Sequence, residues 1–313
     1  MFKSSFIGAG LALLVGCASV NAPVADSAYT RVESHIPEWG AIIELGSGKQ
    51  VSPTQLLDEL APAHTVMVGE VHDNFAHHLI EQWLATHLAK RRPQGAVVLE
   101  MLDSDQQRPV AEVQAWLGQG NQVRSQRLQQ IIHWDPRWSW EQYGTLMAAL
   151  MPAPAALLAG NLSGAERKRL MATAPANPDG LFPSPAIAAR QRQQIKQMHC
   201  GQIDAARMNA MLAIQHARDQ RMAQVLDNAQ APRLLLAGVL HTLKSLGAPQ
   251  YLGQGASDPG LKVLVIAEQD HRLSASDADY VWMLPSADAE GAALVTDAGG
   301  CDQPAIEAFI TRN

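Results

Sequence analysis

The sequence predicts an α/β protein in which a mostly parallel sheet is flanked by helices and a smaller helical subdomain is inserted. Three observations lead to this prediction. Short apolar runs without polar alternation recur along the chain, and such runs are typical of strands buried on both faces of a parallel sheet. Segments with helical periodicity separate these runs. At 47% hydrophobic and 17% charged residues, the composition excludes disorder, collagen and coiled coil.

The first segment, residues 1–16, is predicted to be a signal peptide. Lys3 provides one positive charge, and the apolar and small residues from Phe6 to Gly16 follow it. This run is too short to span a bilayer. It is therefore interpreted as a targeting segment that is not part of the fold.

The residues that end this segment, Leu-Val-Gly-Cys, resemble the bacterial lipobox, in which the cysteine receives lipid and becomes the mature first residue. Cys17 is the expected lipidation site, and residues 17–35 are expected to form a tether. Because Ala18 is not Asp, resemblance to lipoprotein sorting implies the outer membrane. An ordinary cleaved signal peptide with a chance cysteine is the alternative.

The remaining residues, 36–313, are predicted to form one α/β domain. Strands are expected at 41–45, 65–69, 96–100, 155–160, 233–238 and 261–267. Helices are expected at 76–90, 105–117, 138–150, 164–172 and 186–228. Because residues from about 104 to 228 contain one convincing strand and much helix, part of this region is predicted to be a helical insertion.

The charge balance excludes one class of partner. The chain has 24 Lys and Arg against 30 Asp and Glu, which gives a formal charge of -6 at pH 7. Its longest run of basic residues is Lys-Arg-Arg at 90–92. No segment is suited to neutralise a phosphate backbone, so nucleic acid is not an expected partner.

Acidic and histidine residues follow three of the predicted strands. Glu70 and His72 come directly after the strand at 65–69, Glu100 ends the next strand, and His241 follows the strand at 233–238. Residues i and i+2 of a strand point the same way, and ligands of open α/β sheets bind at the carboxyl ends of the strands. We therefore expect one shared site for a divalent metal or for proton transfer, although isolated hydrogen-bonded side chains are the simpler alternative.

Further candidate residues lie on the predicted helices. Of His77 and His78, only one is expected to face the strand ends and the other is expected to be solvent-exposed, and His77 is a candidate to hold an anionic group. Tyr143 belongs to an aromatic cluster, at 134–143, that is either core or a face for a flat ligand. Arg218 lies on a methionine-rich helix stripe, which is either core or a face for an apolar ligand or a second subunit. If Arg218 is buried, it needs an acidic partner or a ligand carboxylate.

These motifs, taken in order, resemble the ChaN-like haem-binding uptake lipoproteins of the Tiki and erythromycin-esterase-like superfamily. The matching pieces are Gly-Glu-Val-His-Asp-Asn at 69–74, Leu-Glu-Met at 99–101, His-Trp-Asp through Tyr at 133–143, His-Cys-Gly at 199–201 and Ala-Gly-Val-Leu-His at 237–241. The resemblance implies haem binding in iron uptake, with haem held between two subunits. It leaves an outer-membrane haem receptor open as a further partner.

The resemblance also implies roles for particular residues. A tyrosine is expected to ligate the haem iron, because a phenolate suits ferric haem. Tyr143 is the preferred candidate, and Tyr251 and Tyr280 remain open, whereas Tyr29 lies in the tether. The haem propionates would be held by His77, Arg137 and Arg218.

The same superfamily contains metal-dependent hydrolases with two Gly-x-x-His motifs and acidic residues, which supplies an alternative function. Under this alternative, Glu70, His72, Glu100 and His241 hold a divalent metal that activates water. Whether Cys200 and Cys301 pair in an oxidising compartment is left open by the sequence.

Overall fold

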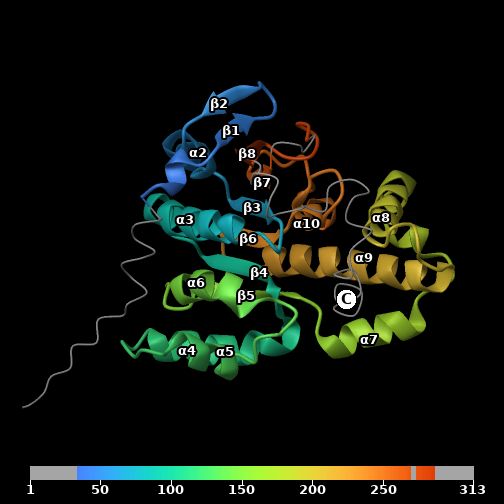
Figure 1. Cartoon of the computed structure of the whole chain (residues 1–313), viewed down its shortest axis with the longest axis horizontal. Coiled ribbons are helices and arrows are strands. Elements are labelled where there is room, and N and C mark those ends of the chain that lie inside the picture. The colour runs from blue at the N-terminus through green and yellow to red at the C-terminus, as the bar shows by residue number, and fades with distance from the viewer. Residues whose placement is uncertain (1–33, 269–272, 286–313) are drawn as a thin grey trace, which may run out of the picture.

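The computed structural model describes residues 34–268 and 273–285 of the chain (Figure 1). Its described part contains one eight-stranded sheet with the order β2-β1-β8-β7-β3-β6-β4-β5. The strands are β1 (Ala41–Glu44), β2 (Lys49–Val51), β3 (Thr65–Glu70), β4 (Ala96–Asp103), β5 (Ala156–Asn161), β6 (Arg233–Gly238), β7 (Leu261–Glu268) and β8 (Tyr280–Leu284). Pairing is parallel from β8 through β5, and only β1 pairs antiparallel, with β2 and with β8. The predicted fold class, with a mostly parallel sheet, is confirmed.

Helices cover both faces of this sheet. They are α2 (Pro53–Leu60), α3 (Phe75–Arg91), α4 (Gln107–Leu117), α5 (Ser125–Ile131), α6 (Trp140–Leu150), α7 (Gly164–Thr173), α8 (Pro185–Met198), α9 (Ala205–Asn228) and α10 (Val239–Thr242). Four 3₁₀ turns accompany them: η1 (Ile36–Glu38), η2 (Ser104–Gln106), η3 (Pro178–Leu181) and η4 (Ala248–Tyr251). No helix within the described ranges is both long and apolar enough to span a membrane.

Two hydrophobic cores, one on each face of the sheet, explain why the strand sequences do not alternate. Val66 and Val68 of β3 face the core that α3 and α6 complete, whereas Met67 faces the core that α8 and α9 complete. Successive strand residues point to opposite faces, so a strand covered on both sides needs apolar residues at every position. All six residues of β3 and all eight of β4 are buried.

The structure differs from the predicted elements in a few places. It adds β2, β8, α2, α5 and α10, and it divides the predicted helix at 186–228 into α8 and α9. Cys200 and Gly201 have φ angles of 54° and 74°, which a right-handed helix does not allow, so α8 ends before them. Cys200 is disulfide-bonded, and Cys301 lies outside the described residues. Cys17 and Tyr29 also lie outside the described residues.

Two glutamines of α4 bond the outer edge of β5, the last strand of the sheet. Gln107 Oε1 accepts from the Ala159 amide at 2.8 Å, and its Nε2 donates to the Leu157 carbonyl at 3.1 Å. Gln114 accepts from the Leu157 amide at 2.9 Å and donates to the Ala155 carbonyl at 3.1 Å. These side chains take the place of a further strand.

The strand order brings the ends of β3, β6 and β4 together. From β3 the chain passes through α3 to β4, two positions away, and β6 later fills the gap between them. From β6 the chain then crosses to β7, on the other side of β3. Such a reversal of winding direction leaves a crevice at the carboxyl ends of the strands, where ligands of α/β sheets bind.

Candidate functional site

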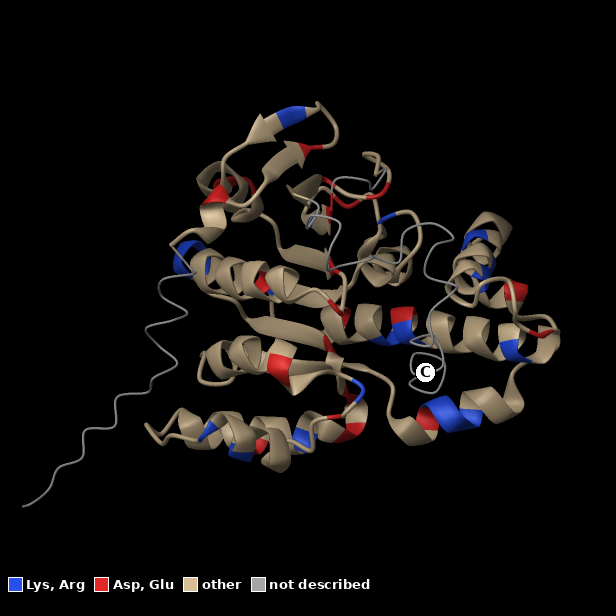
Figure 2. Cartoon of the chain, in the orientation of Figure 1, with Lys and Arg blue, Asp and Glu red and all other residues tan. Residues whose placement is uncertain are grey.

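The four polar residues predicted at the strand ends lie together in the structure. Glu70 ends β3, whereas Glu100 lies inside β4, because that strand continues past the predicted end to Asp103; His72 and His241 lie beside the two glutamates. Figure 2 shows charged residues at the ends of these central strands, close to α9 and to the loop before α6. The expectation that parallel strand ends bring these side chains into contact is met by the geometry.

Glu70 is the centre of the first group of contacts. Its Oε1 contacts His72 Nδ1 and accepts the Tyr143 hydroxyl at 2.9 Å. Its Oε2 lies 3.4 Å from Nε2 of the buried His78. Burial raises the pKa of Glu70, but His72 and His78 outweigh that effect and hold it well below its usual range. Glu70 is therefore an ionised carboxylate at neutral pH.

Glu100 links His72 to His241. Its Oε2 accepts from the Gly238 amide at 2.8 Å and lies 3.6 Å from His72 Nε2, and its Oε1 lies 3.4 Å from His241 Nε2. Nδ1 of His241 contacts Asp219 Oδ1 at 2.6 Å. Asp219, on α9, thereby fixes which ring nitrogen of His241 faces Glu100.

The neighbouring carboxylates raise the pKa of both histidines. Burial lowers the pKa of His72, but Glu70 and Glu100 raise it to about 9. Burial likewise lowers the pKa of His241, and Glu100 and Asp219 raise it above its usual value. Burial raises the pKa of Asp219 to about 6 despite the opposing charge of His241. The cluster is a chain of carboxylate–imidazole contacts in which His72 is an imidazolium at neutral pH.

This arrangement gives no support to the predicted divalent metal. Within residues 34–268 and 273–285, no group of three or more His, Cys, Asp or Glu side chains is arranged to hold a metal ion. His72, one of the predicted ligands, instead contacts Glu70 and Glu100. The four residues are thus engaged with one another in this structure.

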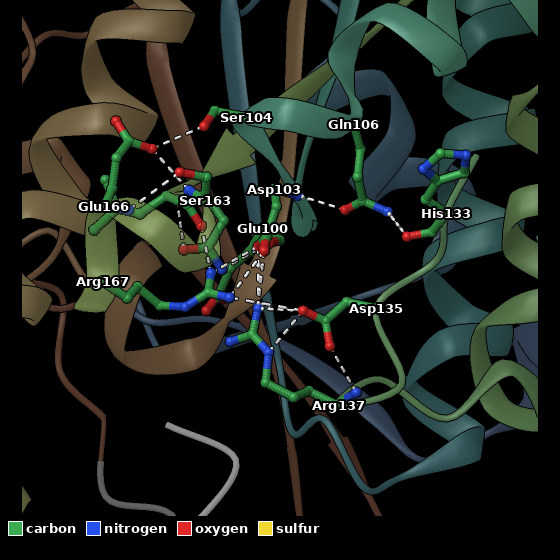
Figure 3. A network of polar contacts seen from close by, with 12 residues as sticks. Glu100, Asp103, Ser104, Gln106, His133, Asp135, Arg137, Ser163, Glu166 and Arg167 are labelled. Carbon is green, nitrogen blue, oxygen red and sulfur yellow. Dashed lines mark hydrogen bonds and ion pairs between the residues drawn. The ribbon is translucent and has the colours of Figure 1, made fainter. Parts of the chain in front are cut away.

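A second network, of arginines and aspartates, lies next to this cluster (Figure 3). Nη2 of Arg137 is 3.1 Å from both oxygens of Asp103, and Arg167 donates to the same two oxygens at 2.9 Å. Arg137 also binds Asp135 at 2.8 Å, and Arg167 lies 3.6 Å from it. Arg137, predicted to hold a propionate, therefore has its guanidinium engaged by two carboxylates.

Arg218 of α9 behaves differently from these two arginines. Only 4% of its surface is exposed, and among the described residues it has no hydrogen bond or ion pair. Its neighbours Met211 and Met222 are buried in the core, as the simpler interpretation of the methionine stripe predicts. Arg218 is thus a buried cation without a bonded counter-ion.

The expectation that one of His77 and His78 is solvent-exposed is wrong, because both are fully buried. His77 Nδ1 accepts from the Val71 amide at 3.0 Å and so holds the turn after β3. His78 stacks on Tyr143 with ring centroids 4.0 Å apart. Two residues that are adjacent in a helix are both buried here, because α3 is covered by the sheet and by α6.

Tyr143, the preferred iron ligand, lies inside the molecule. Only 1% of its surface is exposed, and its ring contacts Trp134 and Trp138, so the aromatic cluster is largely core. Burial, together with Glu70 and Glu81, raises the pKa of the Tyr143 hydroxyl well above its usual value. This environment keeps the phenol protonated.

Tyr251 is the partly exposed tyrosine within the described ranges, since Tyr280 is 2% exposed. Its hydroxyl lies 3.1 Å from His216 Nδ1. His216 in turn contacts the edge of Phe182, with ring centroids 5.5 Å apart. Burial lowers the pKa of His216, so this imidazole is neutral at pH 7.

Sequence reasoning missed several residues of these networks. Asp103, Arg167 and Asp219 carried no motif, although Asp103 follows the predicted strand at 96–100 by only three residues. Asp103 could have been found by extending the predicted strand, because β4 continues from Ala96 to Asp103. Arg167 and Asp219 lie on helices whose rotation against the sheet is set by tertiary packing.

Comparisons with known proteins agree with this fold. A Campylobacter jejuni ChaN structure, with cofacial heme binding, matches with a TM-score of 0.68 at 22% sequence identity, covering 78% of this chain and 96% of that one. A mutant of the erythromycin esterase EreC, in its open conformation, matches with a TM-score of 0.44 at 14% identity, covering 77% of this chain and 81% of that one. No curated protein matches the chain.

A match to a family model shows the family to which this chain belongs. The model described as haem-binding uptake, Tiki superfamily, ChaN, matches residues 56–252, which extend from α2 to the residue after η4. This range contains Glu70, His72, Glu100 and His241 as well as the His216 and Tyr251 pair. The chain therefore belongs to the ChaN family of haem-binding uptake proteins in the Tiki superfamily.

Proposed function

We propose that this chain is a lipid-anchored protein of the outer membrane that binds haem for uptake, with haem held between two copies of the chain and with Tyr251 as the iron ligand. Family membership supports haem binding. The observation that carries the assignment of the ligand is the pairing of a partly exposed tyrosine hydroxyl with a neutral histidine.

The His216 and Tyr251 pair fits a ferric haem. Burial, with Asp219 nearby, raises the pKa of the Tyr251 hydroxyl, so the free phenol stays protonated at neutral pH. A bound ferric iron would supply the Lewis acidity that favours the phenolate. His216 Nδ1, 3.1 Å from the hydroxyl, is placed to take the released proton. Tyr143 lacks this arrangement, because its hydroxyl contacts the ionised Glu70 and the cationic His72.

Two further features support haem at a surface shared by two copies. Leu181, next to Phe182, exposes 39% of its surface, so an apolar side chain lies beside this pair. A haem on such a surface would be covered on one face only, and a second copy would cover the other face. The Campylobacter jejuni ChaN structure has cofacial heme binding, which is consistent with such a pair of haems.

Hemin titration of the detergent-solubilised full chain tests this function. We expect a high-spin spectrum with a charge-transfer band for the wild type, because a single phenolate exerts a weak field. Tyr251→Phe should lose the band and stay folded, since the ring remains and only the oxygen is removed. Sedimentation velocity with and without hemin should show a haem-dependent shift from monomer to dimer.

Tyr143→Phe and Tyr280→Phe are the matched controls of this experiment. Both should keep the wild-type spectrum. If Tyr143→Phe loses the band instead, the ligand predicted from the aromatic cluster is correct and Tyr251 is not. If all three variants keep the band, tyrosine ligation is wrong, and if the wild type binds no hemin, the proposed function fails.

The proposed anchor predicts the behaviour of Cys17→Ser. The variant should carry no lipid, because serine does not provide the thiol that is modified, and it should leave the membrane fraction. Metabolic labelling with a radioactive fatty acid, followed by membrane fractionation, measures both effects. Cys200→Ser is the control and should keep its label. Lipid label and outer-membrane recovery of Cys17→Ser equal to wild type would show that the lipobox is a chance resemblance.

A further inference from the structure

Arg218 of α9, near the carboxyl ends of β4 and β6, takes part in none of the hydrogen bonds or ion pairs of the site described above. Arg218 is 4% exposed, and within residues 34–268 and 273–285 neither a carboxylate nor a carbonyl accepts from its guanidinium. Its Nε is enclosed and has no hydrogen-bond partner, and leaving a buried donor unmet costs free energy. Buried arginines are normally paired, so this one requires an explanation.

The neighbouring acids are already occupied by other partners. Asp103 and Asp135 bind Arg137 and Arg167. Glu100 accepts from the Gly238 amide and faces His72 and His241. Asp219, the residue next to Arg218, contacts His241 instead. Four carboxylates therefore lie in this region, and none of them forms a hydrogen bond or ion pair with Arg218.

The surrounding positions suit an anionic oxygen group. Arg218 lies close enough to Glu100, Asp103, Arg137 and Arg167 for their charges to act on it. It is carried by α9, which contacts β4 and β5 near the crevice where the winding of the sheet reverses. Its small exposed fraction admits only a small group or the tip of a larger one. Arginine's planar fork matches both carboxylate and phosphate oxygens.

We propose that Arg218 anchors a site for a small anionic oxygen group, a carboxylate or a phosphate, at the carboxyl ends of β4 and β6. The group is either a free anion or a propionate of haem. Its oxygens take the place of the missing counter-ion. The free-anion alternative does not depend on the His216 and Tyr251 pair, whereas the propionate alternative rests on the proposed function.

Thermal unfolding of the full chain tests the site with free anions. In chloride buffer, Arg218→Met should unfold at the same temperature as the wild type or higher, because an unpaired buried cation is removed. Phosphate or acetate in place of chloride, at equal ionic strength, should raise the wild-type Tm by about 3 °C or more and leave Arg218→Met unchanged. Arg221→Met, one turn further along α9, is the control, because Arg221 is paired with Glu166 and should keep the anion response.

Hemin and hemin dimethyl ester, whose propionates are blocked, distinguish the two sources. If a propionate occupies the site, the wild type should bind hemin at least ~10-fold more tightly than the ester, and Arg218→Met should remove this difference. A free anion instead gives the Tm response with no preference for hemin over the ester. Both results support the site.

Three results would overturn the proposal. The first is a wild type whose Tm does not rise with phosphate or acetate and which binds hemin no more tightly than the ester. The second is an Arg218→Met variant whose Tm rises with the anions as much as that of the wild type. A Tm of Arg218→Met far below that of wild type in chloride would assign Arg218 a purely structural role. Because the anion experiment uses no haem, failure of hemin binding would reject the proposed function without deciding this site.

Discussion

Asp103→Ala should lower the free energy of unfolding by about 3–5 kcal/mol, because two largely buried guanidinium groups lose the carboxylate they share and are left with Asp135 alone. Asp103 is 4% exposed, and both of its oxygens bind Arg137 and Arg167. Neither arginine reaches water readily, since their side chains are 15% and 11% exposed. For a chain of this size, the loss corresponds to a fall in Tm of roughly 10 °C.

Chemical denaturation of the variant and a matched control measures this effect. Glu112→Ala removes the partner of Arg108 in an exposed pair on α4, and we expect no measurable change. Combining Asp103→Leu with Arg137→Met, Arg167→Met and Asp135→Asn should recover much of the stability, because all four charges of the network are then removed together. A Tm change for Asp103→Ala no larger than that of Glu112→Ala would show that the network contributes little.

Glu81→Gln should stabilise the protein, and the gain should grow with pH. Glu81 of α3 is fully buried, and its two oxygens have no hydrogen-bond partner among the described residues. Burial, with the charges of Glu70 and Glu100, raises its pKa well above the ordinary value of 4.5. The folded state therefore holds Glu81 protonated at pH values where the unfolded chain ionises it.

The sign of this effect follows from proton binding. Below pH 4.5 Glu81 is protonated in both states and has no influence on stability. Above that pH the unfolded state releases the proton, so the wild type loses stability up to the folded pKa, by about 1.4 kcal/mol for each unit of the pKa shift. Glutamine has the same shape and no proton to lose, so Glu81→Gln avoids this loss.

Urea denaturation at pH 4.5, 6 and 8 checks the prediction. The stability difference between Glu81→Gln and wild type should be smallest at pH 4.5 and should rise by more than ~1 kcal/mol by pH 8. Glu141→Gln, on the exposed surface of α6, should show no such trend. A constant difference across the pH range would mean that Glu81 ionises inside the folded protein.

The strand ends were predictable from the sequence because of one geometric rule. Parallel strands end on the same edge of a sheet, so Glu70, Glu100 and the histidines after β3 and β6 had to meet. Apolar runs also predicted six strands, since continuous burial leaves a clear pattern. The short β2, with its sequence Lys-Gln-Val at the sheet edge, carries no such pattern.

The chemistry of the cluster was less predictable than its position. Whether His72 is a metal ligand or an imidazolium depends on Glu70 and Glu100 both reaching it, at distances that only the fold sets. The burial of Tyr143 and of both His77 and His78 depends on how α6 lies over α3. Helix periodicity shows which residues share a face, but it does not show how many faces are covered.

The two glutamines of α4 that bond the edge of β5 also limit how copies of this protein can assemble. An exposed edge strand recruits a neighbouring chain by offering free amide and carbonyl groups. Along β5, the amides of Leu157 and Ala159 and the carbonyl of Leu157 are already hydrogen-bonded to Gln107 and Gln114. Two copies therefore do not fuse their sheets through this edge into a continuous ribbon. The dimer proposed above would therefore have to form through a surface other than this edge.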